Sequence, residues 1–393
     1  MKNKQSGRIA GGSFLVIGNT IGAGMLSLPL ITAASGALTS IILMILSWSV
    51  MYVTSFKLLT LCSEYKLGVN FTTLNADKMP KILQPFFVII YLLLLYALMS
   101  AYTTQGASLV NTVSMNHVSN TAVDTFIYLI IFGMIILSTN LSDYVNRSFV
   151  SLKLIFFGLC VIFMLSYFHF ENFFSKPLSY YALLYAWPTL LPSFGFQNMV
   201  PVLYEYQKGD LKAIKKSILI GSLAVLVVYI IWVSICLALI PQLGNVSYKA
   251  LFLDGNTLDQ FIKLIKEGTE NNWIQTFLTV FINISIITSF ICVGLSLYHY
   301  VRDIFKSYGI KLWKIFGFII CFLPPFAFTV FYPKGFILAL QYAAIFAVII
   351  FVFTPIYLDK KSRFEAKNLY PLILGALVII AQVLNLIGFS KPF

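Results

Sequence analysis

The chain has 393 residues, of which 59% are hydrophobic and only 10% are charged, and its mean hydropathy is +0.88. This composition is too apolar for a soluble domain of this size, and apolar residues recur in runs of about 20, the length that crosses a bilayer. The net charge of +13 does not by itself indicate a nucleic-acid partner, because unequal charge between loops on the two sides of a membrane explains it better. The five cysteines stand singly, without metal or redox spacing, and we predict neither a metal nor a cofactor.

Eleven apolar segments are long enough to be transmembrane helices, which predicts an all-α integral membrane protein with one transmembrane domain, residues 1–393. The first segment does not resemble a signal peptide, because it is long and lacks a small-residue cleavage site. In chain order the segments lie near 9–35, 37–60, 82–110, 122–139, 149–169, 181–204, 215–240, 273–299, 312–332, 334–357 and 370–390.

The loops predict the direction of these helices. With the N-terminus in the cytoplasm, 21 of the 27 Lys and Arg residues fall on the inner side of the membrane. Basic residues accumulate on the cytoplasmic side of membrane proteins, so we predict a cytoplasmic N-terminus and an outer C-terminus. The one long outer loop, 241–272, has a spacing of apolar and charged residues that fits a short amphipathic helix. It is either a lid over the outer mouth or a solvated connector.

Two of the segments contain helix breakers. Gly22-Ala23-Gly24 interrupts the first segment, and Pro192-Ser193-Phe194-Gly195-Phe196 interrupts the sixth. Lipid tolerates a broken helix only where protein or a water-filled cavity surrounds the freed backbone groups. Discontinuous helices at matching places in two halves of a chain indicate a secondary transporter. The alternative is that these glycines only allow close packing of helices.

The segment count and the breaks also suggest an internal repeat. The first five segments, about 9–170, start inside, and the next five, about 181–357, start outside. The two halves would therefore be inverted copies, each beginning with a broken helix, and the segment at 370–390 would be an extra helix.

Helix ends supply the chemistry of the predicted site. Each break leaves N–H groups unpaired on the second half-helix and C=O groups unpaired on the first. The half-helices that begin near Gly24 and Gln197 would point their positive ends at the midplane, which suits a carboxylate. The carbonyls suit an ammonium group or a cation. A zwitterionic amino acid satisfies both, so we predict a small-molecule substrate of the amino acid class.

Lys153 is the basic residue that stands out, because it lies six residues after Arg147 inside the fifth segment. Its side chain either snorkels back to the cytoplasmic surface or is buried among carbonyls at the first break, where it could exchange a proton during transport. Acidic and histidine residues lie near segment ends, so a buried carboxylate or histidine relay has little support. Without a nucleophile, metal cluster or acid pair at mid-membrane, we predict that the chain is not an enzyme.

Four segments resemble the bacterial tyrosine- and tryptophan-specific permeases, namely GNTIGAGMLSLP (18–29), NRSFVSLK (146–153), SFGFQNMVP (193–201) and FLPPFAFTVFYPKGF (322–336). These permeases form the hydroxy/aromatic amino acid permease family of the amino acid–polyamine–organocation superfamily. The resemblance covers nearly the whole chain and is strongest to the tyrosine-specific branch. It implies a LeuT-type 5+5 inverted-repeat fold with broken helices 1 and 6. It also implies proton symport of tyrosine, or next tryptophan, across the bacterial inner membrane by alternating access.

The resemblance further implies roles for particular residues. The groups that hold the substrate carboxylate and amino groups would be Thr20, Gly22, Ala23 and Gly24, and the facing wall would be Ser193, Phe194, Gly195 and Phe196. Lys153 matches the span 5 lysine of proton-coupled relatives. Thr288 and Ser289 stand where sodium-driven relatives place hydroxyl ligands of their ion.

Tyr96 and Ser100 in the third segment are one turn apart, so they share a face that we expect to meet the substrate. Asn283 and His299 in the eighth segment, and Gln197-Asn198, depart from the family pattern and could alter selectivity. The alternative function is a sodium-coupled neutral amino acid symporter of the same fold, although an ammonium at Lys153 would compete with Na⁺. The sequence leaves the oligomeric state open, and a monomer would suffice.

Overall fold

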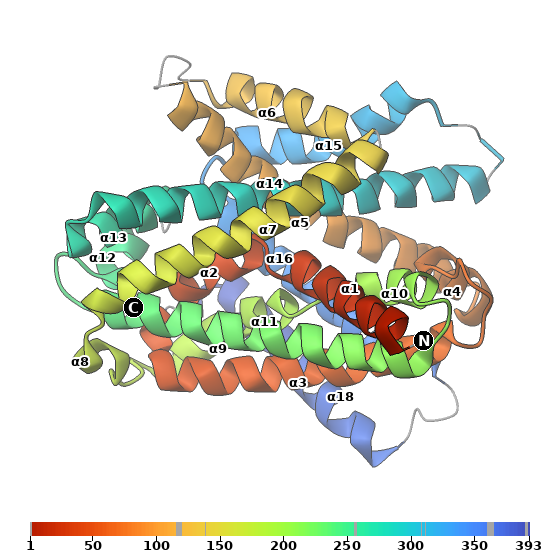
Figure 1. Ribbon diagram of the computed structural model, residues 1–393, viewed down its shortest axis with the longest axis horizontal. Helices are drawn as coiled ribbons and strands as arrows, with labels where there is room; N and C mark the ends of the chain where they lie inside the picture. Colours follow the sequence, from red (N-terminus) through yellow and green to blue (C-terminus); the bar gives the residue numbers. More distant parts are fainter. Residues whose placement is uncertain are drawn as a thin grey trace. The chain divides into compact units, whose positions relative to one another are not determined.

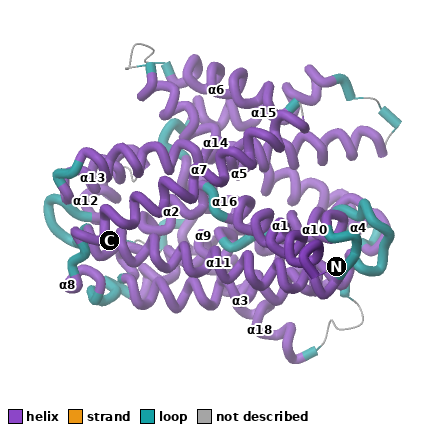
Figure 2. Tube along the Cα trace, in the orientation of Figure 1, coloured by secondary structure: helices purple, strands orange, loops and turns teal. Residues whose placement is uncertain are grey.

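The computed structural model describes residues 2–114, 120–137, 139–254, 258–307, 309–310, 312–359, 365–389 and 392–393. These residues form helices and loops and contain no strand (Figure 2). The predicted all-α class is therefore confirmed.

The α-helices follow one another along the chain with short connections (Figure 1). They are α1 Lys2–Thr20, α2 Ala23–Thr32, α3 Ala37–Cys62, α4 Phe71–Lys78, α5 Gln84–Val113, α6 Thr121–Ile136, α7 Thr139–Met164, α8 Phe170–Phe173, α9 Tyr180–Ser193, α10 Val200–Tyr206, α11 Leu211–Leu239, α12 Tyr248–Leu253, α13 Leu258–Thr269, α14 Asn272–Ser307, α15 Lys314–Phe331, α16 Phe336–Ala347, α17 Thr354–Leu358 and α18 Leu369–Leu386. Short 3₁₀ turns are η1 Ala33–Ser35, η2 Leu165–Tyr167, η3 Gln197–Met199 and η5 Ala366–Asn368, and η4 Val348–Phe353 is a π-helical turn.

Within the described residues, eight helical stretches are long and apolar enough to cross a bilayer. They are α3, α5, the Ser148–Tyr167 stretch of α7 and η2, α11, α14, α15, α18, and the stretch Phe336–Leu358 made of α16, η4 and α17. A ninth is the pair α1 and α2, which is bent by 54° at its break. Shorter helices, α6 and the pair α9 and α10, occupy the expected fourth and sixth spans.

The chain forms two compact units, and each unit takes segments from both halves of the sequence. The first unit contains 1–91, 176–234 and 344–393, and therefore both predicted breaks. The second unit contains 92–175 and 235–343, and therefore Lys153.

In the first unit, α3, α9 and α18 pack together. Pro188 lies inside α9 and has no N–H to donate to the carbonyl of Leu184. Asn385 of α18 supplies that donor, with its Nδ2 at 3.2 Å from the Leu184 oxygen. The helix α18 thus supplies a hydrogen-bond donor that α9 lacks.

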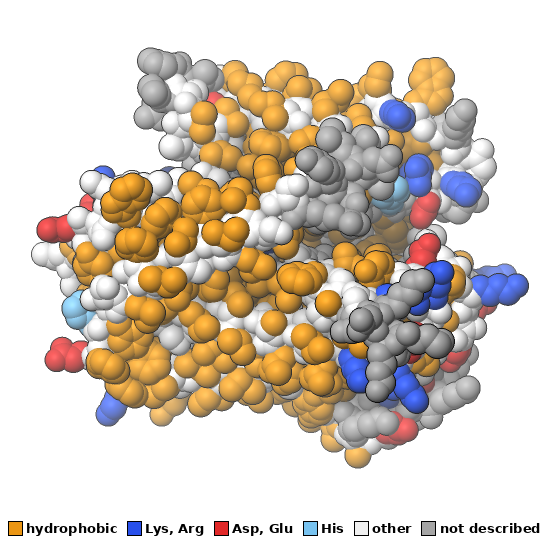
Figure 3. Space-filling view, in the orientation of Figure 1, with side chains coloured by type: hydrophobic (Ala, Val, Ile, Leu, Met, Phe, Trp, Pro, Cys, Tyr) orange, Lys and Arg blue, Asp and Glu red, His pale blue; other side chains and the backbone are white. Residues whose placement is uncertain are grey.

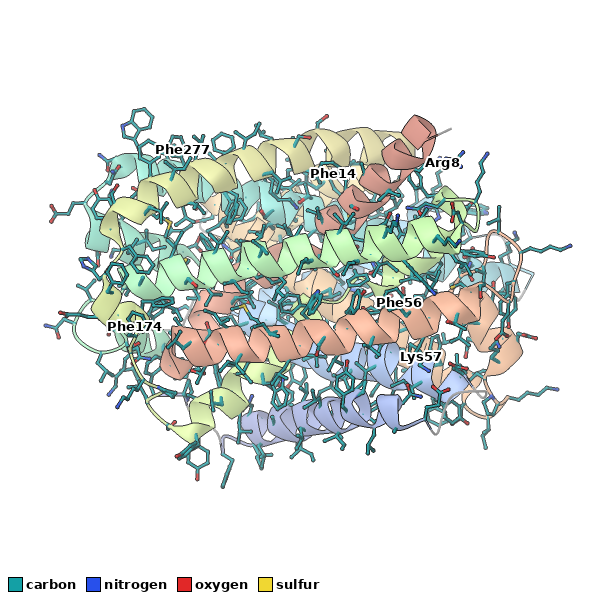
Figure 4. All side chains as sticks on the ribbon, turned by 60° about the horizontal axis from the view of Figure 1, so that its bottom comes forward. Arg8, Phe14, Phe56, Lys57, Phe174 and Phe277 are labelled. Atoms are coloured by element: carbon teal, nitrogen blue, oxygen red, sulfur yellow. The ribbon has the colours of Figure 1, made fainter. Side chains whose placement is uncertain are left out.

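The surface of the first unit separates apolar from basic residues. Hydrophobic side chains cover the visible faces of α3 and α11, while Lys and Arg gather near the N-terminus, α4 and α10 (Figure 3). Lys57, labelled in Figure 4, is nearly buried near the end of α3, and its Nζ lies 3.3 Å from the Asp359 carboxylate and 3.8 Å from that of Glu365. This ion pair joins the end of α3 to the chain after α17.

In the second unit, α7 and α14 pack along one another, and α6 packs on α14 and α15. The expected outer loop contains two helices, α12 and α13, where the sequence predicted one. The amphipathic character predicted there belongs to α13, whose Phe261, Leu264 and Ile265 are buried.

The helix α13 is attached to α5 through one carboxylate. Asp259 accepts a hydrogen bond from the Gln105 amide at 3.3 Å and another from the Ser108 hydroxyl. The solvated-connector interpretation of this loop therefore does not describe α13, which is fixed to a long helix of its own unit.

Candidate functional site

The first break lies between α1 and α2. The helix α1 ends at Thr20, Gly22 has an extended backbone (φ −143°, ψ −155°), and α2 begins at Ala23. The interruption is therefore Ile21-Gly22, slightly before the position that the sequence pattern indicated. Ala23 and Gly24 lie in the first turn of α2, where a helix presents unpaired N–H groups.

The second break separates α9 from η3 and α10. Ser193 ends α9, and Phe194 to Phe196 are not helical. A Cβ on Gly195 would lie 2.9 Å from the Pro192 carbonyl oxygen and 3.3 Å from the ring of Phe351, so this position has room only for glycine. Phe351 belongs to the π-helical turn η4, which the sequence did not predict.

The two breaks face one another within the first unit. A Cβ on Gly24 would lie 3.3 Å from Ser193 Oγ and 3.7 Å from Ser193 Cα. Phe194 and Phe196 beside them are each only 1% exposed. The structure therefore brings together predicted site residues from the two breaks, which are about 170 positions apart in the sequence.

A tyrosine that the sequence analysis did not select joins the breaks. The hydroxyl of Tyr229 on α11 donates to the Thr20 carbonyl at 2.6 Å and lies 3.1 Å from the Ser193 carbonyl. These are the last carbonyls of the two first half-helices. The only signal in the sequence is a tyrosine within an apolar run, which is too common here to be informative.

The hydroxyl groups at the breaks bond within their own helices. Thr20 Oγ1 donates to the Val16 carbonyl at 2.7 Å, and Ser193 Oγ donates to the Thr189 carbonyl at 2.7 Å. In this conformation both hydroxyls donate within their own helices, so the polar groups that the breaks offer to a ligand come from the backbone more than from these side chains.

Three side-chain amides flank the breaks. Asn19 and Asn198 form a reciprocal pair, with N···O distances of 3.1 and 3.0 Å. Gln197 is fully buried, accepts from the Phe196 N–H at 2.9 Å and donates to Thr54 Oγ1 on α3 at 3.0 Å. Both residues that depart from the family pattern after SFGF thus hold the second break in place.

Lys153 on α7 is fully buried, so its side chain does not snorkel to the surface. Its Nζ donates to Thr288 Oγ1 on α14 at 3.4 Å. Thr288 and Ser289 both donate to the Ser285 carbonyl, at 3.0 and 2.8 Å. The structure therefore places the three predicted coupling residues together in the second unit.

The remaining predicted residues lie in the second unit with other partners. Tyr96 donates its hydroxyl to the Ile320 carbonyl of α15 at 2.9 Å, and Ser100 is buried with its carbonyl accepting from Thr104. His299 pairs through Nδ1 with Arg302 at 3.1 Å. That Tyr96 and Ser100 meet the substrate stays a prediction.

Comparison with known proteins places these features in context. A model of the tryptophan/tyrosine permease family matches residues 5–390. The chain is 30% identical to tyrosine-specific transport system 1 of Haemophilus influenzae over 390 residues, which are 98% of this chain and 96% of that protein. It is 29% identical to the low affinity tryptophan permease of Escherichia coli over 387 residues, covering 95% and 92% of the two chains.

A solved structure shares the fold. Mhp1, a nucleobase-cation-symport-1 family transporter in a closed conformation with bromovinylhydantoin bound, gives a TM-score of 0.66. The match covers 95% of this chain and 90% of Mhp1, at 13% sequence identity. At this identity the likeness establishes the arrangement of helices and nothing about the ligand.

Proposed function

Because the chain belongs to the tryptophan/tyrosine permease family, we propose that it imports aromatic amino acids, tyrosine first and tryptophan next, by proton symport through alternating access. The resemblance seen in the sequence is thereby confirmed, and the chain is a multi-pass membrane transporter and not an enzyme. The observation that carries the proposal is the meeting of two helix breaks at Gly24 and Ser193.

The proposed substrate site uses the ends of the half-helices. The first turn of α2, with the N–H groups of Ala23 and Gly24, would receive the substrate carboxylate, because a helix N-terminus carries partial positive charge. The carbonyls of Thr20 and Ser193 would receive the amino group. Each already accepts from Tyr229, but a carbonyl oxygen has a second lone pair to offer.

The rest of the proposed binding site follows from the same breaks. Gly22 would allow the ligand to approach the backbone, and Phe194, Gly195 and Phe196 would form an apolar wall for an aromatic side chain. Both phenylalanines are buried in this conformation, so access to the wall requires the conformational change that alternating access supplies.

The proposed architecture has eleven spans, with inverted repeats of about 9–170 and 181–357 and an extra helix at 370–390. The broken pairs α1–α2 and α9–α10 at the start of each half support the repeat. The location of 21 of 27 basic residues on one side supports a cytoplasmic N-terminus and an outer C-terminus in a bacterial inner membrane.

For coupling, we propose that Lys153 carries the proton. A fully buried ammonium beside the hydroxyl of Thr288 is costly and is typical of a functional group in a membrane protein. The alternative is a sodium-coupled symporter of the same fold. It is less well supported because the Lys153 ammonium already contacts the Thr288 hydroxyl that would bind Na⁺.

Uptake of labelled tyrosine into proteoliposomes tests the proposal. We expect accumulation driven by an inward proton gradient, independent of Na⁺ and competed best by tyrosine and tryptophan among the twenty amino acids. Lys153→Met should abolish gradient-driven accumulation, whereas Lys215→Met, a change at an exposed lysine of α11, should not. Uptake that requires Na⁺ and ignores pH, or transport of neither amino acid, would overturn the proposal.

A further inference from the structure

We propose that Tyr229 is a positioning residue that locks the two helix breaks into one substrate-binding geometry. The inference rests on the proposed function, because it assigns a role within the same site. Its basis is that the Tyr229 hydroxyl lies within hydrogen-bond distance of two carbonyls from different half-helices, Thr20 at 2.6 Å and Ser193 at 3.1 Å. Tyr229 itself is 0% exposed.

The hydroxyl has a clear electrostatic task. The C-terminal end of each half-helix carries partial negative charge, and two such ends that face one another repel. A hydroxyl proton placed between the two carbonyl oxygens offsets this repulsion, as in a three-centre hydrogen bond. The shorter distance, to Thr20, indicates the principal acceptor.

The helix α11 delivers the hydroxyl to this point. Ser217, Gly221, Val225 and Tyr229 follow one another at intervals of four residues and therefore share one helix face. Ser217 Oγ donates to the Ile9 carbonyl of α1 at 3.0 Å, and further along the same face Tyr229 reaches Thr20. A rigid helix thus fixes the position of the Tyr229 side chain along α1.

The ring of Tyr229 is fixed independently of its hydroxyl. Its centroid lies 5.0 Å from that of Phe194, the first residue of the second break. Removal of the hydroxyl alone should therefore leave the ring in place and separate the hydrogen bond from the packing. With Tyr229 fixed, the remaining lone pairs of both carbonyls point in set directions, which is the preorganisation that an incoming ammonium group needs.

The test compares Tyr229→Phe with changes at two buried tyrosines of the second unit, which serve as controls. Tyr248→Phe removes a hydroxyl that donates to the Cys236 carbonyl at 2.9 Å, so it loses a similar buried bond. Tyr128→Phe removes a buried hydroxyl that has no hydrogen-bond partner among the described residues. The readouts are the Kd of labelled tyrosine for the purified protein and hydrogen–deuterium exchange of the peptides that contain the breaks.

For Tyr229→Phe we expect Kd to rise about fivefold, since one hydrogen bond contributes roughly 1 kcal/mol and 1.4 kcal/mol corresponds to tenfold. Exchange should accelerate at both breaks together. Both controls should change Kd by less than about twofold and leave exchange at the breaks unchanged. This joint result supports the positioning role, because a general loss of stability would appear in Tyr248→Phe as well.

Three outcomes overturn the inference: exchange at the breaks that is unchanged or rises at only one of them, an unchanged Kd in Tyr229→Phe, or an equal rise of Kd in Tyr248→Phe. If the wild type binds neither tyrosine nor tryptophan, the proposed function fails. The exchange measurement then still decides whether Tyr229 holds the breaks together, because it needs no substrate.

Discussion

Gly221 marks a place where α11 and α1 approach closely, and its substitution tests that approach. A Cβ built there would lie 2.7 Å from Val16 Cβ and 2.9 Å from the backbone oxygen of Ser13. Real Cβ atoms essentially never approach other atoms below 3.0 Å. Neither obstacle is the end of a flexible side chain, so Gly221→Ala must push the two helices apart.

The magnitude follows from two opposing terms. Overpacking a close contact costs about 1–3 kcal/mol, while alanine is favoured over glycine in a helix by roughly 1 kcal/mol. Gly158 on α7 supplies the control, because a Cβ there meets nothing within 4 Å. Gly158→Ala should gain the helix preference of alanine without any clash. The difference in the free energy of unfolding between the two variants should therefore give the cost of the clash at Gly221, about 2 kcal/mol.

The assay is equilibrium unfolding of the purified protein in mixed detergent micelles, with the free energy of unfolding compared between variants. We expect Gly221→Ala to be less stable than the wild type and Gly158→Ala to be equal or more stable. Equal free energies for the two variants would refute the close approach. They would also remove the basis for Tyr229 reaching Thr20, since the same face of α11 makes both contacts.

Three further predictions concern buried polar groups. Gln197→Leu should lower the free energy of unfolding by about 1–3 kcal/mol, because the Phe196 N–H loses its acceptor, and wild-type stability would contradict this. For the ion pair, the free energies of unfolding lost in Lys57→Met and in Asp359→Asn should add up to about 1 kcal/mol more than the loss in the double variant, which is the coupling energy of a double-mutant cycle. Simple additivity would show that the ion pair is unimportant. Asp259→Ala should speed hydrogen exchange in α13, and unchanged exchange would mean that its bonds to α5 do not hold that helix.

The features that the sequence predicted are those encoded in local patterns. The long apolar runs became α3, α5, α11 and α14 because each can satisfy its backbone within one helix. Breaks appear at Gly22 and at Phe194 to Phe196 because glycine, and proline in a helix interior, weaken a helix. The amphipathic helix α13 was likewise predictable, because its apolar residues recur at intervals of three and four.

The features that the sequence did not predict depend on residues distant along the chain. Tyr229 became notable only once α11 was laid along α1, and Lys153 could be assigned to a buried position only once α14 was packed beside it. The π-helical turn η4, which carries Phe351 against Gly195, has no local signature that distinguishes it from an α-helical turn.

The hydrogen bond from Asn385 to Leu184 has a consequence for biosynthesis. The two residues are 201 positions apart, and the helix that contains Asn385, α18, is synthesised after α9. Until then, the proline at position 188 leaves a carbonyl of α9 without its donor in the lipid, where an unsatisfied backbone group costs several kcal/mol. The hydrogen bonding of α9 is therefore completed only after α18 inserts, and nascent chains cut before α18 should be targets for membrane quality control.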